Sequence, residues 1–238
     1  MAVSYTICHL IKFTNQDKYF VPNQGILAGV EILPESRYEV ADQSFCRIVI
    51  NGNEHEVVKY TAFQDVKQNK HGRILETSFT WYLEPHQFCM YYISGLNLMI
   101  IGTGKQTVET FLNQMKNDKS SGFLCEHIDV DFKKIQPLLP IISGAWFAEL
   151  QKKKQYLKAA GYFGNHVDQS EEFKAAAEAG VISALSLPYE FRGRTISISI
   201  TKNGAIVIYS RIKNQITQNP DVPSELELIL NVYCKYIK

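Results

Sequence analysis

The chain has 238 residues, of which 45% are hydrophobic and 21% charged, a balance typical of a globular protein with one large core or two smaller ones. A net charge of +1 excludes a global field that would attract nucleic acid or an anionic membrane, so any such surface must be a local patch. The most apolar window, 88–101, is too short to span a bilayer, and we expect no membrane partner. Five widely spaced cysteines, mostly in apolar runs, are typical of reduced core thiols and predict a cytoplasmic protein: Cys8, Cys46, Cys89, Cys125 and Cys234.

The first part of the chain predicts mainly strands. Residues 4–13 are rich in β-branched and aromatic types, which favours a first strand. Residues 45–50 and 56–63 flank Asn51-Gly52-Asn53, and this pattern predicts a β-hairpin. Residues 64–72 have few apolar side chains and are expected to form a solvated loop.

Two more strands and a helix follow. We expect strands over 74–83 and 88–101, with a turn at Glu84-Pro85-His86 between them. A helix is expected to begin near Gln106, because apolar residues then recur at spacings of three and four. The polar run 117–122 after this helix is the predicted subdomain boundary.

The second half mixes strands and helices again. Strands are expected over 123–132 and 141–150, with a short helical piece from Lys133 between them. A helix over 169–179 has Asp168 or Ser170 as its N-cap and Gly180 as its stop.

The C-terminal part contains the clearest pattern in the chain. Residues 181–189 lead into a hairpin over 194–210, in which isoleucines alternate with serines and Asn203-Gly204 makes the turn. A last helix over 224–237 begins at Ser224, which has capping-box spacing to Glu227. We therefore predict an α+β fold with two subdomains of mostly antiparallel sheet and packed helices, 1–119 and 120–238, and with the C-terminal helix on the sheet.

Two short motifs suggest chemistry, and each has a simpler explanation. Gly102-Thr103-Gly104-Lys105 precedes a helix as a phosphate loop does, but its spacing is wrong, so a strand-to-helix turn is preferred. The segment 125–129 places a cysteine, a histidine and an aspartate at alternate positions, but no second group of metal ligands accompanies it. The pair Glu171-Glu172 is explained by the helix dipole. With no nucleophile motif either, the sequence predicts no catalytic residue, metal or cofactor.

The strongest functional signal is electrostatic. Residues 191–214 contain five basic side chains and no acidic one, and a second basic cluster lies ahead of them. Such patches can follow a phosphate backbone without reading its sequence, although exposed hairpin edges carry the same residues to prevent strand pairing. The predicted nucleic-acid contacts are Arg192, Arg194, Lys202, Arg211, Lys213, Lys152, Lys153 and Lys154.

The arrangement of 88–115, a hydrophobic double strand ending in Gly102-Thr103-Gly104 and an amphipathic helix, followed by a strand-rich second half, resembles the RexA-type phage-exclusion proteins. The segments 142–147, 161–164 and 168–173 are also similar to a pattern in uncharacterised proteins of bacteria and their mobile elements. The resemblance implies a two-subdomain, dimeric, non-enzymatic protein that binds DNA with little sequence preference and takes part in phage–host conflict.

Three functions remain open at this point. The first is a binding protein for nucleic acid, acting in antiviral defence or mobile-element biology. The second is a module that inhibits or scaffolds a protein partner through aromatic residues such as those of 80–82 and 90–92. The third is an enzyme whose site is assembled from distant residues, which predicts a deep pocket lined by titratable groups.

Overall fold

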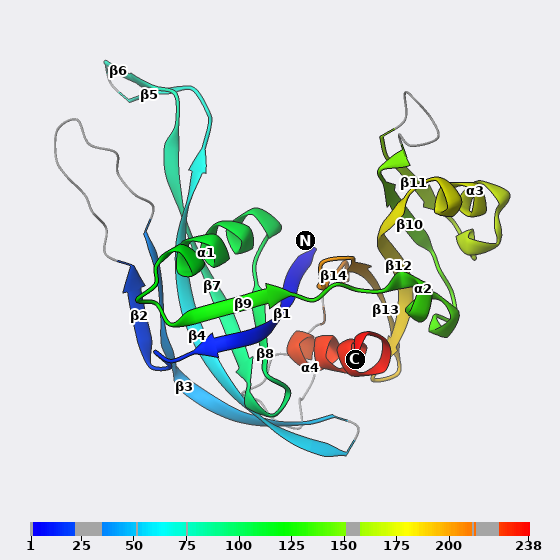
Figure 1. Ribbon diagram of the computed structural model, residues 1–238, viewed down its shortest axis with the longest axis horizontal. Coiled ribbons are helices and arrows are strands. Elements are labelled where there is room, and N and C mark those ends of the chain that lie inside the picture. Colours follow the sequence, from blue (N-terminus) through cyan, green and yellow to red (C-terminus); the bar gives the residue numbers. More distant parts are fainter. Residues whose placement is uncertain are drawn as a thin grey trace. The chain divides into compact units, whose positions relative to one another are not determined.

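The structure is a computed structural model that describes residues 2–21, 35–50, 52–74, 76–150, 158–210, 212 and 224–238 (Figure 1). The chain divides into two compact units, and neither is continuous in sequence. One unit, here the C-terminal unit, comprises 1–7, 49–53 and 127–238, and the other, the N-terminal unit, comprises 8–48 and 54–126. The chain passes from the N-terminal to the C-terminal unit for the last time between residues 126 and 127, just after the polar run 117–122.

The described residues of the N-terminal unit form an antiparallel sheet with one α-helix. Its strands follow the order β1-β8-β7-β4-β3-β2, and β9 pairs with β1. A small separate hairpin joins β5 and β6. The strands are β1 (Val3–Phe13, from Cys8 on), β2 (Lys18–Val21), β3 (Ser36–Ile50), β4 (Asn53–Gln68), β5 (Gly72–Ile74), β6 (Thr77–Phe79), β7 (Tyr82–Ile93), β8 (Leu98–Gly102) and β9 (Phe123–His127).

Helix α1 (Lys105–Asn117) covers one face of this sheet (Figure 1). Its predicted stripe is buried as expected, and Phe111 meets Phe88 and Phe123 edge to face at centroid distances of 5.5 and 5.8 Å. Such aromatic pairs add to the free energy of burial, so the helix and the strands share one core. The loop after α1 is fastened to β2, where the Tyr19 hydroxyl donates to Asp118 at 2.8 Å.

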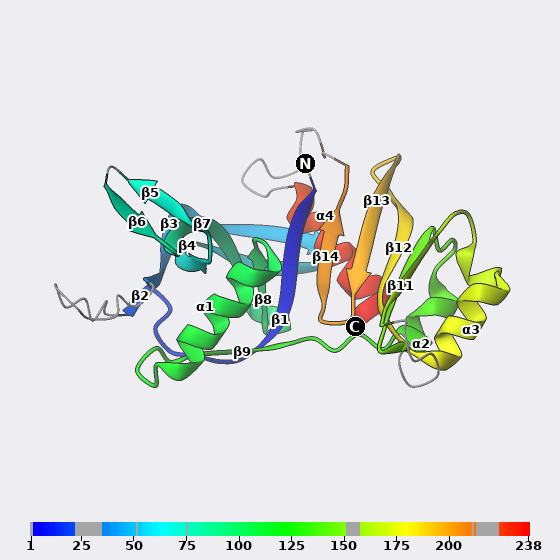
Figure 2. The ribbon, with the colours of Figure 1, turned by 90° about the horizontal axis from the view of Figure 1, so that it is seen from above.

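The C-terminal unit is also an antiparallel sheet, and Figure 2 shows β14, β13 and β12 side by side. The strand order is β11-β10-β12-β13-β14-β1, with β1 contributing residues up to Ile7. The predicted hairpin is β13 (Arg194–Thr201) and β14 (Ala205–Ile208), and Ile198 pairs with Ile208. The other strands are β10 (Gly144–Ala148), β11 (Ala160–Phe163) and β12 (Val181–Phe191).

In the described part of this unit, three α-helices accompany the sheet. Helix α2 (Phe132–Ile135) is short and runs into a 3₁₀ turn over Gln136–Leu138. Helix α3 (Glu171–Ala179) begins as predicted, because Ser170 Oγ accepts from the amide of Phe173 at 3.1 Å. Helix α4 (Ser224–Val232) is buried almost all round and continues as a π-type turn over Tyr233–Ile237.

The fold is α+β with mostly antiparallel sheet, as predicted. Some element predictions were wrong. Glu84-Pro85-His86 lies inside β7, and the reversal before β8 is a 3₁₀ turn over Ser94–Leu96. Residues 64–68 continue β4, and 74–83 is broken into parts of β5, β6 and β7. No helix among the described residues is long and apolar enough to cross a membrane.

Candidate functional site

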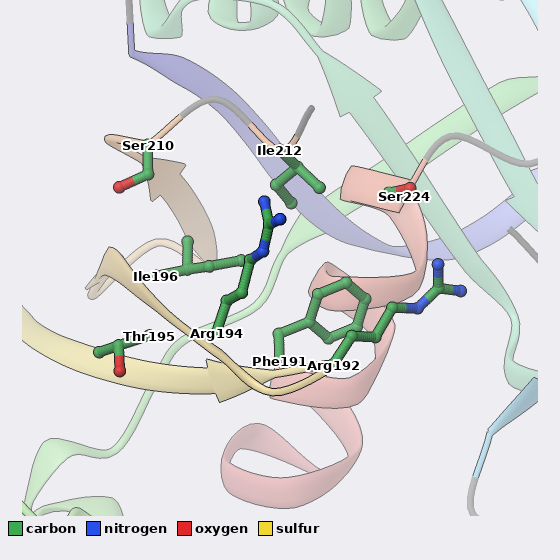
Figure 3. A pocket seen from close by; sticks show the side chains of 8 residues that line it. All are labelled: Phe191, Arg192, Arg194, Thr195, Ile196, Ser210, Ile212 and Ser224. Carbon is green, nitrogen blue, oxygen red and sulfur yellow. The ribbon is translucent and has the colours of Figure 1, made fainter. Parts of the chain in front are cut away.

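Three of the eight predicted contact residues are described by the structure: Arg192, Arg194 and Lys202. The other five, Arg211, Lys213, Lys152, Lys153 and Lys154, lie outside the described residues. Figure 3 shows the end of the β12–β13 hairpin where the two arginines lie.

Arg192 and Gly193 form the turn between β12 and β13. Both have positive φ angles, 50° and 72°, as the two central residues of a type I′ hairpin turn do. Glycine accepts this conformation without strain, whereas arginine does not, so Arg192 is held by its contacts. Its guanidinium donates to the Glu227 carboxylate of α4 and lies 5.3 Å from the centre of the Phe191 ring. The charge of Arg192 is therefore already balanced.

Arg194, the first residue of β13, lines a small pocket of about 90 Å³. Its side chain extends toward Ile212, whereas Arg192 points away past Phe191 (Figure 3). Among the described residues Arg194 has no ion-pair partner. The pocket is lined by Phe191, Arg192, Arg194, Thr195, Ile196, Ser210, Ile212 and Ser224.

The polar groups of this pocket suit an anion. Ser224 provides a hydroxyl and is only 7% exposed, whereas the Thr195 hydroxyl donates to the Glu190 carboxylate. Ser224 is also the first residue of α4, whose N-terminus favours negative charge, although Glu225 and Glu227 in its first turn already provide some of it. A guanidinium forms paired hydrogen bonds with phosphate or carboxylate oxygens. The lining includes no histidine, carboxylate, thiol or lysine, so among the described residues it lacks an obvious general base.

Lys202 does not join this site. It follows the last residue of β13, whereas Arg194 begins the strand. At about 3.4 Å per residue, the eight steps between them span roughly 27 Å. The described part of the predicted basic patch is therefore one balanced arginine, one unpaired arginine and one distant lysine, and it does not form a continuous surface.

The two other sequence motifs, the glycine-rich segment 102–105 and the segment 125–129, have structural explanations. Strand β8 ends at Gly102 and α1 begins at Lys105, so this segment is a strand-to-helix turn. Burial, with the neighbouring Cys8 thiol, raises the pKa of Cys125 well above its ordinary value, which disfavours the thiolate that a metal needs. No group of three or more histidines, cysteines or carboxylates in the described ranges could hold a metal ion.

The aromatic segments proposed for protein binding differ from each other. Met90 and Tyr91 are buried in the sheet, at 0% and 4% exposure, so 90–92 belongs largely to the core. Trp81 is 37% exposed, and the Lys67 ammonium lies 4.6 Å from the centre of its ring. A further aromatic pair, the exposed Phe163 with the half-buried Trp146, could not be predicted, because the two residues meet only through strand pairing.

Comparison with known proteins adds no family to this description. No protein-family model matches the chain, and a search of curated proteins finds no relative.

Proposed function

We propose that this protein is a non-enzymatic binding protein whose ligand is a nucleic acid, held through its phosphates with little sequence preference. The observation that carries this proposal is the Arg194 guanidinium, which has no ion-pair partner among the described residues and lines a pocket together with Ser224 at the start of α4. The RexA resemblance adds the biological setting of the proposal, which is conflict between phages and their hosts or mobile-element biology.

The size of the pocket favours a phosphate over a base. A volume of about 90 Å³ accommodates a single small oxyanion group and leaves the rest of a ligand outside. Contacts of this kind position a nucleic acid but carry no sequence information. They also make affinity fall as salt rises, because each neutralised phosphate releases condensed counterions.

The test is a fluorescence-anisotropy titration of labelled single-stranded and duplex oligonucleotides of unrelated sequence across a range of salt. We expect binding at low salt, and we expect Arg194→Ala to weaken it about equally for all sequences. The slope of log K against log salt should fall by about 0.7 for single strands or 0.9 for duplex, the value of one phosphate contact. Arg194→Lys should lie between, since lysine keeps the charge but loses the paired hydrogen bonds.

The matched control is Lys12→Ala, which removes the same charge from an exposed position of β1 in the N-terminal unit. An equal loss in both variants would show a general charge effect and contradict the assignment to Arg194. Absence of wild-type binding at low salt would remove the proposed function.

A further inference from the structure

The C-terminal unit carries an aromatic pair on the edge of its sheet. Phe163, on the edge strand β11, is 67% exposed. Its ring lies over two glycines, Gly144 of β10 and Gly161 of β11, so close that a Cβ atom at either position would stand 3.2 or 3.1 Å from a ring carbon. One face of the Phe163 ring thus packs on the backbone of these two glycines, while much of the side chain is accessible to solvent.

Trp146 of β10 stands beside this ring. The two ring centroids are 4.9 Å apart, and the ring planes meet at 82°. The Trp146 ring therefore lies beside the Phe163 ring and is nearly perpendicular to it. A flat group that stacked on Phe163 would present its edge to the indole of Trp146.

Strand register shows what surrounds the pair. Phe163, Gly144, Ser186 and Ser199 form one row across four strands, and Gly161, Trp146, Ala184 and Thr201 form a second row on the same face. None of these side chains is charged. Helix α3 covers the opposite face, where Phe173 meets Phe147 at a centroid distance of 5.2 Å. On the face with the aromatic pair, Ser199 is 2% exposed and the Ser186 hydroxyl is buried, so the accessible part lies at the β11 edge around Phe163.

Two lysines lie near the two ends of the second row, just outside strands β11 and β13. Lys158 lies three residues before Gly161, and Lys202 follows Thr201 at the other end of the second row. Both are exposed, and neither has an ion pair with a residue that the structure describes. Cations near an exposed aromatic ring complement a nucleotide, which joins a flat base to a phosphate.

We propose that Phe163 and Trp146 form a binding site for an unpaired base of a single-stranded nucleic acid. This inference rests on the proposed function and deepens it, because it makes single strands the preferred ligand. Every base has a π-face, so stacking on Phe163 is tolerant of sequence. In a duplex the bases are stacked on one another and cannot reach this ring.

The experiment uses the Trp81→Phe variant, in which Trp146 is the single tryptophan of the chain. Quenching of Trp146 fluorescence is titrated with a short oligothymidylate, with a duplex of matched length and with a maltodextrin, which probes sugar stacking. Phe163→Ala and Phe163→Tyr are compared in this background. The matched control is Phe45→Ala, which removes a 75% exposed phenylalanine from β3 in the N-terminal unit.

We expect oligothymidylate to quench Trp146, and Phe163→Ala to weaken its binding by roughly 5- to 150-fold, the range for loss of one base–aromatic stack. Phe163→Tyr should restore most of the affinity, and duplex binding should change by less than about twofold under the same principle. An equal loss in Phe45→Ala, or unchanged single-strand affinity in Phe163→Ala, would overturn this site and leave the proposed function standing. Quenching by maltodextrin alone would assign the pair to a sugar and overturn the proposal. A wild-type protein that binds no oligonucleotide at low salt removes the proposed function together with this site.

Discussion

Replacing Glu227 with glutamine should strengthen nucleic-acid binding. The Glu227 carboxylate holds the Arg192 guanidinium, and the two side chains are 24% and 26% exposed. Arg192 lines the pocket beside Arg194, but its guanidinium points away from Arg194, and its charge is balanced by Glu227. Glutamine keeps the shape of the side chain and removes its charge, so Arg192 becomes available to a second phosphate.

The size of the effect follows from counterion release. One more phosphate contact steepens the slope of log K against log salt by about 0.7 for single strands and 0.9 for duplex, which corresponds to an affinity gain of about five- to eightfold at 0.1 M salt. The same substitution should lower the free energy of unfolding by only about 0.5–1 kcal/mol, because partly exposed ion pairs contribute little.

The assay is anisotropy at several salt concentrations, with denaturant unfolding measured in parallel. Glu178→Gln is the matched control, since it removes the same charge from the exposed side of α3 in the same unit. Equal gains in both variants would reduce the effect to net charge. Unchanged affinity and salt slope in Glu227→Gln would refute the idea that Arg192 is a balanced phosphate contact.

Three further predictions concern stability and the aromatic pair. Gly122→Ala should lower the free energy of unfolding by roughly 2–4 kcal/mol, because Gly122 has a φ of +61° and a Cβ would lie 1.8 Å from Thr14 Oγ1. In denaturant unfolding, Thr14→Ala should recover part of this loss, and a fully stable Gly122→Ala protein would contradict the geometry. Burial raises the pKa of Cys8 to about 12, so the thiol stays neutral in the folded chain while it ionises in the unfolded one. The free energy of unfolding should therefore fall as pH rises from about 9 to 12, by up to about 1.4 kcal/mol per pH unit. The Cys8→Ala variant should show a shallower fall, and equal pH slopes in the two proteins would contradict the raised pKa of Cys8. Gly161→Ala should displace the Phe163 ring and weaken oligothymidylate binding less than Phe163→Ala does, with its salt slope unchanged; full affinity would show that the glycine does not position the ring.

The elements that sequence could predict are those set by local patterns. The alternation of isoleucine and serine along β13 places the three isoleucines in the core, and Asn203-Gly204 fixes the turn. The signal for the start of helix α3 is equally local, because its N-cap is Ser170. Each of these signals lies within a few residues of the structure that it determines.

Pro85 shows why one local signal misled. Proline and its neighbours favour a turn, yet Pro85 pairs with Asp65 of β4 inside a long strand. Strand β8 pairs with β7 only from Cys89 onward, so near Pro85 the strand has one neighbour in that sheet. A proline is tolerated at such an edge, because its missing N–H faces away from the ladder.

The candidate sites depended on contacts that sequence does not reveal. The basic run 191–214 predicted a patch, but Glu227, which balances Arg192, lies 35 residues further along the chain. Charge counting within one segment cannot detect that partner. Phe163 and Trp146 belong to separate strands, and only the register of β10 and β11 brings them together.

The two proposed contacts lie on opposite faces of one sheet, and this placement restricts the ligand. Ser199 shares its face with Phe163 through paired rows, whereas Arg194 has the opposite parity in β13 and lies on the face of Ile196. A duplex is stiff over about 150 base pairs, so it cannot bend around a single sheet to reach both. A flexible single strand can pass round the edge of the sheet, with a phosphate at Arg194 and a base at Phe163. Simultaneous use of both contacts by one molecule is therefore consistent with single-stranded nucleic acid and not with duplex.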